Sequence, residues 1–565
     1  MTAAAPVRGE APGRRPAPVR GEAPGRVPVP PTPIDGGAEA AAQRLGAPAV
    51  PVPGAILDRV RQEGGTVELG LGPRAEAGRD WWPLAIGWAA RGQVPARPAA
   101  VVRPTSAAQV AQLLAACTRD LVPVTAMGGR SGVCGGAVPV YGGVALDCTG
   151  LVGEVRLDEA SLVAEVPAGT NGRELEETLR GTGEGYTLGH WPQSIDLSTV
   201  GGWLACRSAG QYSTRYGKVE DMAAGLEVAL ADGSLVRTGA SAPRAATGPD
   251  LTQLFTGSEG VLGVITRAWL RVHPLPAAEG RRAYSFATFE DGLDCCRRVL
   301  RRGATPAVLR LYDAAESERT YAHPGGCVLV VLDEADPAIC AATLAVVDDE
   351  CARAARLDDE IVAHWLRIRN DVSVLAPTWR AGIVVDTAEV AGRWATLPAL
   401  CRDVVAALRA IDGTIAVSVH LSHAYLDGAC LYFTFAGRPG DGGRGGGGGG
   451  GGDADGDGDA DGGGGGGGGG GGLIGDAMPE ASPAATPEES YYRRAWDALA
   501  EVVVARGAAI SHHHGVGLSR GRFLAHALGG AHDVLVALKR ALDPAGVLNP
   551  GKLGIPTRFG EVPWP

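Results

Sequence analysis

Strand-like and helix-like stretches alternate along most of the chain. Residues 99–102 form a short apolar run, and Ser106 then opens a helical stretch whose apolar residues are three and four apart. Short strands and glycine turns outnumber long helices up to residue 275, which predicts an α+β domain over residues 51–275. Within it we predict strands at 121–126, 144–148 and 162–166, a helix at 171–180, and a hairpin over 219–238 that turns at Ala231-Asp232-Gly233.

The pattern changes after residue 275, where longer helical stretches separate the strands. The apolar runs 327–332 and 430–435 are typical of buried strands. We therefore expect a second α+β domain over residues 276–435.

Two low-complexity segments interrupt this pattern. Residues 1–50 are rich in Pro, Ala and Gly, and they repeat the nonapeptide PVRGEAPGR at 6–14 and 18–26. Such a segment buries too little apolar surface to offset its ordering entropy, so we predict a disordered tail. Residues 436–486 form a Gly/Asp-rich insertion that we also predict to be disordered.

The aspartates of this insertion, from Asp453 to Asp461, resemble the start of a calcium-binding loop. Such a loop needs a bidentate Glu at its twelfth position, where this chain has Gly in every register. A flexible surface insertion is therefore favoured over a calcium site.

Composition excludes several classes of protein. Hydrophobic residues make up 45% and charged residues 20%, as in soluble globular proteins, and the net charge of −11 argues against nucleic-acid binding. The 11 cysteines are scattered without a C-x-x-C pair, which indicates reduced thiols. We expect neither a signal peptide nor a membrane span, because no apolar run is long enough, and we predict a cytoplasmic protein.

A glycine-rich turn follows the strand predicted at 121–126. It reads Met127-Gly128-Gly129-Arg130-Ser131-Gly132, and its glycines let the backbone approach a ligand closely. Successive amide groups of such a turn can form a nest around a pyrophosphate. A tight turn without a ligand explains the same residues, and the turn matches neither a Walker loop nor a G-x-G-x-x-G helix start.

Three further glycine-centred segments, residues 190–203, 206–217 and 257–266, follow the turn in this order and change this balance. With it they resemble the FAD-binding domain of the vanillyl-alcohol oxidase family, also called the PCMH-type domain. The resemblance implies that FAD is bound by residues from all four segments. These are Met127, Gly128, Gly129, Arg130, Ser131, Gly132, Gln193, Ser194, Asp196, Ser198, Thr199, Cys206, Arg207, Ser208, Ala209, Glu259, Gly260, Leu262, Gly263, Val264 and Ile265.

This resemblance implies a fold as well as a cofactor. The FAD-binding domain would consist of two α+β subdomains, and a cap domain with an antiparallel sheet flanked by helices would cover 276–435 and 487–525. Residues 526–565 would return to the FAD-binding domain. Some relatives attach FAD through a His in the first turn, but no His lies between Leu121 and Leu146, so we predict non-covalent FAD.

The cap domain resembles the alkylglycerone-phosphate synthase family. The similar stretches include 306–311, Tyr425 with 427–433, and 511–517. The resemblance implies exchange of the acyl group of an acyl-glycerone phosphate for a fatty alcohol through a flavin N5 adduct, without net oxidation. It implies a small-molecule or lipid-derived substrate, and leaves open a peripheral membrane contact and a homodimer.

The same resemblance assigns roles to several residues. Tyr432 matches the proton donor and acceptor, and His512, His513 and His514 match an essential histidine run, of which one or two should point at the flavin or Tyr432. A strand aromatic in the core and a solvated histidine loop are the structural alternatives. Arg310 matches an arginine beside the flavin and substrate; a surface ion pair is its alternative.

One departure from the family concerns the substrate. The arginine expected to grip it corresponds to His420, which offers fewer donors and is mostly neutral near pH 7. We therefore keep an FAD-dependent dehydrogenase or oxidase of a 2-hydroxy acid or alcohol as the alternative function. In such relatives a metal-binding stretch resembles His420, His423 and Asp427, but a Cys and missing Asn and His argue against it here, so we predict no metal.

Overall fold

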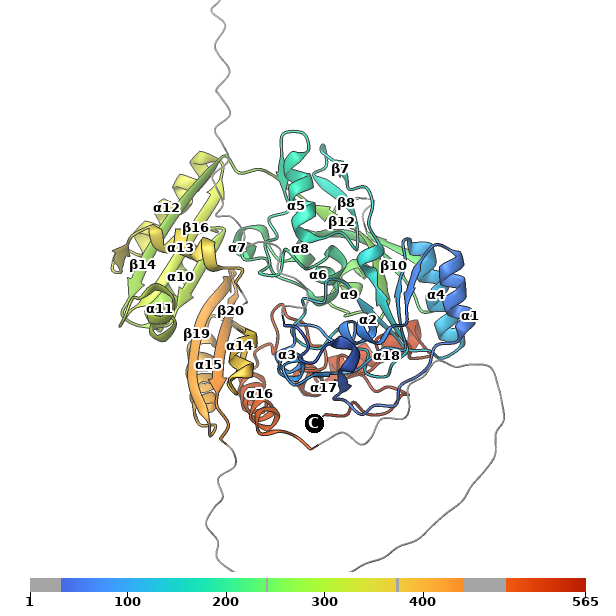
Figure 1. The fold of residues 1–565 in the computed structure, drawn as a ribbon. Coiled ribbons are helices and arrows are strands. Elements are labelled where there is room, and N and C mark those ends of the chain that lie inside the picture. Colours follow the sequence, from blue (N-terminus) through green and yellow to red (C-terminus); the bar gives the residue numbers. More distant parts are fainter. Residues whose placement is uncertain (1–31, 240–241, 372–374, 441–483, 565) are drawn as a thin grey trace, which may run out of the picture.

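A computed structural model gives the fold of residues 32–239, 242–371, 375–440 and 484–564. The predicted calcium-like aspartates and residues 1–31 of the predicted tail lie outside the described residues. Two parts face one another in Figure 1, a seven-stranded sheet with its helices and a larger part built on two smaller sheets.

The first small sheet belongs to the predicted FAD-binding domain. Its order is β2-β4-β6-β5, with β4–β6 and β5–β6 parallel. The side chain of Ser106 accepts from the Gln109 amide and caps α4, as the sequence predicts. The elements are α1 (Gly54–Gln62), β2 (Thr66–Glu68), β4 (Ala100–Arg103), α4 (Ala107–Arg119), β5 (Val124–Met127) and β6 (Val144–Asp147).

The second small sheet is five-stranded and antiparallel, in the order β11-β10-β12-β8-β7. The predicted hairpin is confirmed from Ala223 onward, because β10 pairs with β11 around residues 231–233, but residues 219–222 form α8 instead of a strand. The elements are β7 (Arg156–Asp158), β8 (Val163–Pro167), α5 (Gly172–Gly181), α6 (Val200–Cys206), α8 (Val219–Met222), β10 (Ala223–Ala229), β11 (Leu235–Gly239) and β12 (Val264–Arg271). The two sheets confirm two α+β subdomains.

The third sheet forms the cap and has seven antiparallel strands in the order β17-β14-β16-β15-β19-β20-β18. Its strands are β14 (Ala278–Phe286), β15 (Val308–Tyr312), β16 (Cys327–Ala335), β17 (Ala355–Leu357), β18 (Val384–Arg393), β19 (Thr414–Ala424) and β20 (Gly428–Gly437). Helices α10 (Phe289–Arg301), α12 (Pro337–Glu350) and α15 (Leu397–Arg409) contact these strands. The predicted antiparallel cap sheet is confirmed.

The C-terminal helices connect the cap to the FAD-binding part. They are α16 (Pro487–Ala505), α17 (Gly521–Leu528) and α18 (Gly530–Leu542). After α18 the chain runs beside β5, where the Val124 amide donates to the Val547 carbonyl at 2.8 Å and the Asn549 amide donates to the Val124 carbonyl at 2.7 Å.

The remaining elements are short or connect the sheets. They are η1 (Ala38–Ala40), β1 (Ala42–Gln43), α2 (Leu71–Glu76), α3 (Pro83–Ala89), β3 (Gln93–Val94), η2 (Cys148–Gly150), β9 (Tyr186–Thr187), α7 (Ser213–Tyr216), α9 (Leu251–Phe255), β13 (His273–Pro274), α11 (Ala314–Tyr321), α13 (Glu360–Ile368) and α14 (Leu375–Arg380).

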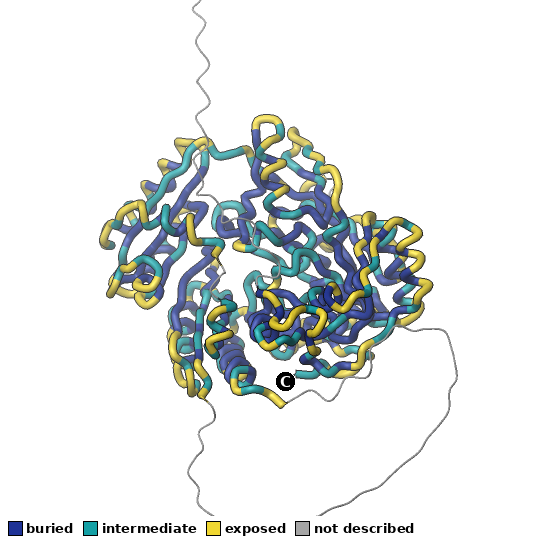
Figure 2. Tube along the Cα trace, in the orientation of Figure 1, coloured by how far each residue is buried: buried dark blue, intermediate teal, exposed yellow. Residues whose placement is uncertain are grey.

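The predicted disorder of residues 1–50 is wrong for residues 32–50. Strand β1 pairs with β3, and apolar side chains such as Leu45 are buried (Figure 2). The buried Arg44 forms an ion pair with Glu489 at 2.7 Å. The predicted insertion is also too long at both ends, since β20 continues to Gly437 and Thr486 caps α16.

Candidate active site

Two adjoining cavities carry the candidate site. The first, which we call the nucleotide cavity, has a volume of about 870 Å³ including its open mouth. Twelve of the residues predicted to bind FAD line it, and they come from all four glycine-centred segments. They are Met127, Gly128, Arg130, Ser131, Gly132, Thr199, Cys206, Glu259, Gly260, Gly263, Val264 and Ile265.

Glycine is required where two of these segments touch. A Cβ on Gly128 would lie 2.2 Å from Thr199 Oγ1, and a Cβ on Gly129 would lie 1.8 Å from the Leu197 carbonyl oxygen. Because no side chain fits there, the 127–132 turn can press its backbone against the 193–199 segment and leave a cleft lined by main chain. Such a cleft fits a dinucleotide.

The second cavity, which we call the substrate cavity, adjoins the first and holds about 2660 Å³ including its open mouth. The predicted FAD residues Gln193, Ser194, Asp196, Ser198, Ser208 and Ala209 line it, together with the predicted substrate and catalytic residues Arg310, His420, Tyr432, His513 and His514. Ser131, Gly132, Gly202, Cys206 and His514 line both cavities, so His514 lies where the two meet.

Three predicted cofactor residues and one histidine line neither cavity. They are Gly129, Arg207, Leu262 and His512. Arg207 ends α6 in a left-handed conformation, with φ 53°, and its Nε donates to the Thr256 carbonyl at 3.1 Å. Arg207 thus joins α6 to the C-terminal end of α9.

The cap sheet presents alternate residues to the substrate cavity. On β20 these include Tyr432 and Thr434, and on β19 they include Ser418 and His420. The intervening Leu431 and Phe433 are fully buried. Successive side chains of each strand thus point alternately to the cap core and to the cavity, and Tyr432 lies on the cavity side.

Tyr432 meets a buried His–Glu pair at the junction of the cavities. The Tyr432 hydroxyl lies 3.0 Å from Nε2 of His514, and Nδ1 of His514 lies 2.9 Å from a carboxylate oxygen of Glu389. Burial raises the pKa of Tyr432, so its phenol is protonated near pH 7. Tyr432 and His514 can therefore exchange a proton, and the carboxylate of Glu389 lies beside the second ring nitrogen of His514 as its charge partner.

Glu389 on β18 organises the whole histidine loop. Its carboxylate accepts from the backbone amides of His512, His513 and His514 and from the side chains of Ser511 and Arg520. Burial alone would raise the pKa of Glu389, but Arg520 and His514 hold it well below the usual range. The sequence analysis missed Glu389 and Arg520. A charged residue between Ala388 and Val390 of an apolar strand was the available signal.

His420 bridges a cation and an anion instead of facing the cavity with free nitrogens. Arg310 Nη2 lies 2.8 Å from His420 Nε2, and His420 Nδ1 lies 3.1 Å from Glu316 Oε1. Burial lowers the pKa of His420, so Nε2 can accept from Arg310. Arg310 keeps a buried Nε without a hydrogen-bond partner among the described residues, which leaves the guanidinium with unused donor capacity beside the cavity.

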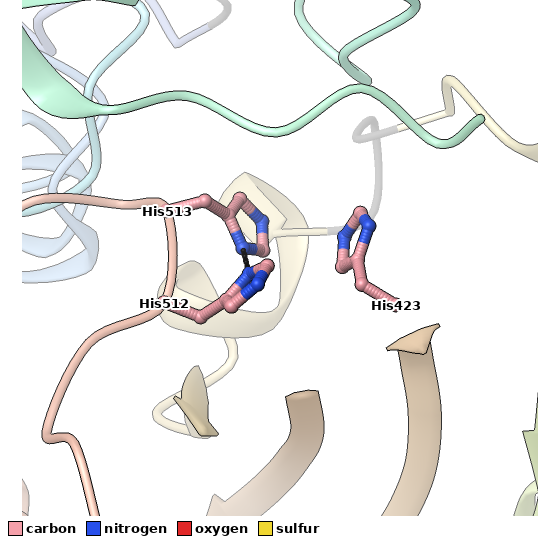
Figure 3. Close-up of side chains that lie close together, drawn as sticks. All are labelled: His423, His512 and His513. Atoms are coloured by element: carbon pink, nitrogen blue, oxygen red, sulfur yellow. Dashed lines mark hydrogen bonds between the residues drawn. The ribbon is translucent and has the colours of Figure 1, made fainter. Parts of the chain in front are cut away.

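Three histidines lie close enough to share a metal ion. Ligand nitrogens of His423, His512 and His513 all lie within 4.8 Å of one another, and Figure 3 shows the His423 ring opposite the rings of His512 and His513. His423 belongs to the stretch that we considered for a metal from the sequence. The described residues do not bring His420 or Asp427 into this group.

Comparison with protein families identifies both parts of the chain. The FAD binding domain matches residues 98–239, and the C-terminal domain of FAD linked oxidases matches residues 275–443 and 478–553. The chain therefore belongs to the FAD-linked oxidase family, and FAD is its cofactor.

Several curated relatives are similar over most of this chain. The FAD-linked oxidoreductase YgcU of Escherichia coli is 28% identical over 476 residues, 81% of this chain and 89% of the relative. Alkyldihydroxyacetonephosphate synthase of Dictyostelium discoideum is 26% identical over 505 residues, covering 82% and 74%. The glycolate oxidase subunit GlcD of Bacillus subtilis is 26% identical over 491 residues, covering 83% and 92%.

A solved alkyldihydroxyacetonephosphate synthase shares the fold, with a TM-score of 0.66 at 21% identity over 91% of this chain and 88% of that one. This confirms the PCMH-type FAD-binding fold. In the part of the chain that the structure describes, no helix has the length and apolar character needed to cross a membrane.

Proposed function

We propose that this protein exchanges the acyl group of an acyl-glycerone phosphate for a fatty alcohol, as an FAD-dependent enzyme similar to alkyldihydroxyacetonephosphate synthase. The observation that carries the proposal is the Tyr432–His514–Glu389 chain at the point where the nucleotide and substrate cavities meet. Bound FAD supplies the nucleophilic and electron-accepting ring that such a substitution requires.

Tyr432 and His514 handle the proton of the substrate in this proposal. The neutral phenol donates its proton to a substrate oxygen, or passes it to His514 Nε2, which lies 3.0 Å away. The carboxylate of Glu389 stabilises the imidazolium that then forms, because it lies 2.9 Å from the other ring nitrogen. The pair can thus act as acid in one half of the exchange and as base in the other.

In this proposal Arg310 binds the phosphate of the substrate; Arg319 and Arg369 also line the cavity. Its planar fork can bind two phosphate oxygens, and its buried Nε has no partner among the described residues. His420 and Glu316 hold the guanidinium through the 2.8 Å and 3.1 Å contacts described above. In this account His420 orients Arg310, and Arg310 binds the substrate in place of the arginine expected at position 420.

The substrate cavity has room for an acyl chain. Its enclosed volume of about 690 Å³ lies in the upper half of the roughly 300–1,000 Å³ range of small-molecule pockets. Apolar side chains such as Trp81, Trp203 and Trp365 form part of its wall. These features favour a lipid-derived substrate over a short hydroxy acid.

A second candidate function is oxidation of a 2-hydroxy acid or alcohol. The similarity to the glycolate oxidase subunit GlcD and the histidine group near the cavity favour it. In that case Arg310 would bind the carboxylate of the acid.

Labelled fatty acid tests the proposal. The holoenzyme is incubated with acyl-glycerone phosphate or with the same ester lacking phosphate, and incorporation of the label into the ester is measured. We expect exchange with the phosphorylated ester and much slower exchange without phosphate. Absence of exchange, together with oxidation of a 2-hydroxy acid by the same preparation, would favour the second candidate.

A further inference from the structure

Two arginines of the substrate cavity lie against the same tryptophan ring. The Cζ atom of Arg310 lies 5.7 Å from the centre of the Trp365 ring, and the Cζ atom of Arg369 lies 5.4 Å from it. All three residues line the cavity. We infer that Arg369 forms a second anion subsite, which binds the carboxylate of the fatty acid while Arg310 binds the phosphate. The choice of a fatty acid as the ligand rests on the proposed function.

Aromatic rings fix the position of the Arg369 guanidinium. Besides the Trp365 ring, its Cζ atom lies 5.2 Å from the centre of the Tyr212 ring and 5.8 Å from that of the Trp191 ring. Such rings attract a cation but do not take up its N–H donors as an oxygen acceptor does. Rings from the cap and from the FAD-binding part thus hold this cation and leave its donors available to a ligand.

One donor of Arg369 is buried and needs an acceptor. Its Nη1 has no hydrogen-bond partner among the described residues, and none of their carboxylates forms an ion pair with it. A buried donor of a charged group is costly to leave unpaired, so an oxygen of a ligand is expected beside it. A carboxylate fits this position, because its two oxygens can accept two parallel N–H bonds from one guanidinium.

Several other charged side chains of the cavity wall are partnered within the protein. Asp196 forms an ion pair with Arg173 at 2.8 Å, and Arg319 lies 3.8 Å from Glu316. Asp371 also lines the cavity, but none of the ion pairs in the part of the chain that the structure describes joins it to Arg369. Arg369 is therefore a cation of this wall whose charge is available to a bound anion.

The proposed exchange produces two anions in one cavity. When the ester is cleaved, the fatty acid becomes a carboxylate while the phosphorylated remainder is still bound, so one guanidinium cannot pair with both. Arg310 has a polar neighbour in His420, which suits a phosphate. Arg369 lies among aromatic rings, and Ile368 and Leu375 extend this apolar wall. Such a wall suits the methylene groups that follow a carboxylate.

Equilibrium binding to the FAD-loaded protein tests the subsite. Decanoate, decanol and glycerol 3-phosphate are titrated separately by calorimetry, without an acyl donor. Arg369→Met should weaken decanoate binding by about 10–100-fold, as expected for lost charge-assisted hydrogen bonds. It should affect the uncharged decanol much less and leave glycerol 3-phosphate binding unchanged. Arg310→Met should instead weaken the binding of glycerol 3-phosphate.

Two further variants control for packing and folding. Arg367→Met changes an exposed arginine of the same helix, α13, which pairs with Glu360, and it should alter none of the three affinities. Arg369→Lys keeps the charge but loses the planar fork, so it should retain part of the decanoate affinity. The flavin absorbance of each variant reports whether the protein is folded and loaded.

Unchanged decanoate affinity in a folded Arg369→Met protein would overturn the proposal. Equal losses for decanoate and decanol would overturn it too, because they would show that Arg369 shapes the cavity without binding the carboxylate. Binding is measured without turnover, so the two proposals can fail separately. A protein that binds decanoate through Arg369 but exchanges no acyl group would refute the proposed function alone.

Discussion

The Tyr432 hydroxyl and His514 Nε2 lie 3.0 Å apart, although 82 positions separate them in the chain. One belongs to a strand of the cap sheet and the other to the loop after α16, and the buried carboxylate of Glu389 holds that loop in place. The pair lies where the nucleotide cavity opens into the substrate cavity.

Tyr432→Phe should keep the flavin and lose turnover. We expect kcat to fall by about 10²–10⁴-fold, the range for removal of a general acid–base group, with little change in KM. Acyl exchange and flavin absorbance are measured on the same sample. Thr434→Val, on the same face of β20, is the matched control and should retain most of the activity. Unchanged turnover in Tyr432→Phe would refute its catalytic role.

Glu389→Gln should destabilise the protein, because it leaves the buried guanidinium of Arg520 without its carboxylate. Removing one partner of a buried ion pair costs about 3–5 kcal/mol, so urea unfolding should shift strongly. Glu154→Gln breaks an exposed pair with Arg156 and should cost less than about 1 kcal/mol. Similar losses in the two variants would contradict the role given to Glu389.

Gly129→Ala should release FAD. Its new methyl group would lie 1.8 Å from the Leu197 carbonyl oxygen, so the 127–132 turn must move. A displacement near 1 Å can cost about 100-fold, and we expect a loss of FAD affinity of that order by fluorescence titration. Gly181→Ala, with no atom within 4 Å of the added methyl group, is the control. Full FAD affinity in Gly129→Ala would show that the close contact is not needed.

Arg310→Met should raise KM for the phosphorylated substrate. Charge-assisted hydrogen bonds contribute about 1.5–3 kcal/mol, which corresponds to roughly 10–100-fold in KM. The ester without phosphate should be affected much less by the substitution. Arg301→Met changes an exposed arginine at the end of α10 and should leave both KM values unchanged. An equal rise for both esters would show that Arg310 does not bind the phosphate.

His190 makes the stability depend on pH in a predictable direction. Burial lowers its pKa to about 3 in the folded protein, against an ordinary value of 6.5. Between these values the unfolded chain binds one more proton, so stability decreases as the pH falls through this window. From pH 6 to pH 4 the free energy of unfolding of the wild type should fall by about 1.4 kcal/mol per pH unit more than that of His190→Gln. Parallel curves for the two proteins would contradict this.

The sequence was most informative where backbone geometry restricts residue choice. Gly128, Gly129, Gly257 and Gly263 cannot be replaced without close contacts, so they are visible as a pattern in a single chain. The family resemblance carried by the glycine-centred segments predicted the fold and twelve of the residues that line the nucleotide cavity. The division of β20 between the core and the cavity was not predicted, because residues 430–435 form a nearly continuous apolar run.

Other parts of the structure could not be predicted, because they depend on contacts between residues that are far apart in the chain. Glu389 lies between apolar neighbours on β18, and its burial depends on the pairing with Arg520 and on the hydrogen bonds from the histidine loop. Residues 32–50 were hidden by their Pro and Ala content, since their order depends on β3 and on Glu489, more than 400 positions away from Arg44. The histidine group likewise joins β19 to a much later loop.

The visible spectrum of the flavin tests the proposed function most directly. The holoenzyme is mixed anaerobically with acyl-glycerone phosphate and labelled fatty acid, and separately with 2-hydroxy acids. We predict that label enters the ester, and that the absorption band of the oxidised flavin is intact once exchange has reached equilibrium. We also predict that no 2-hydroxy acid bleaches this band. Lasting bleaching by a 2-hydroxy acid, without exchange of label in the first sample, would contradict the account.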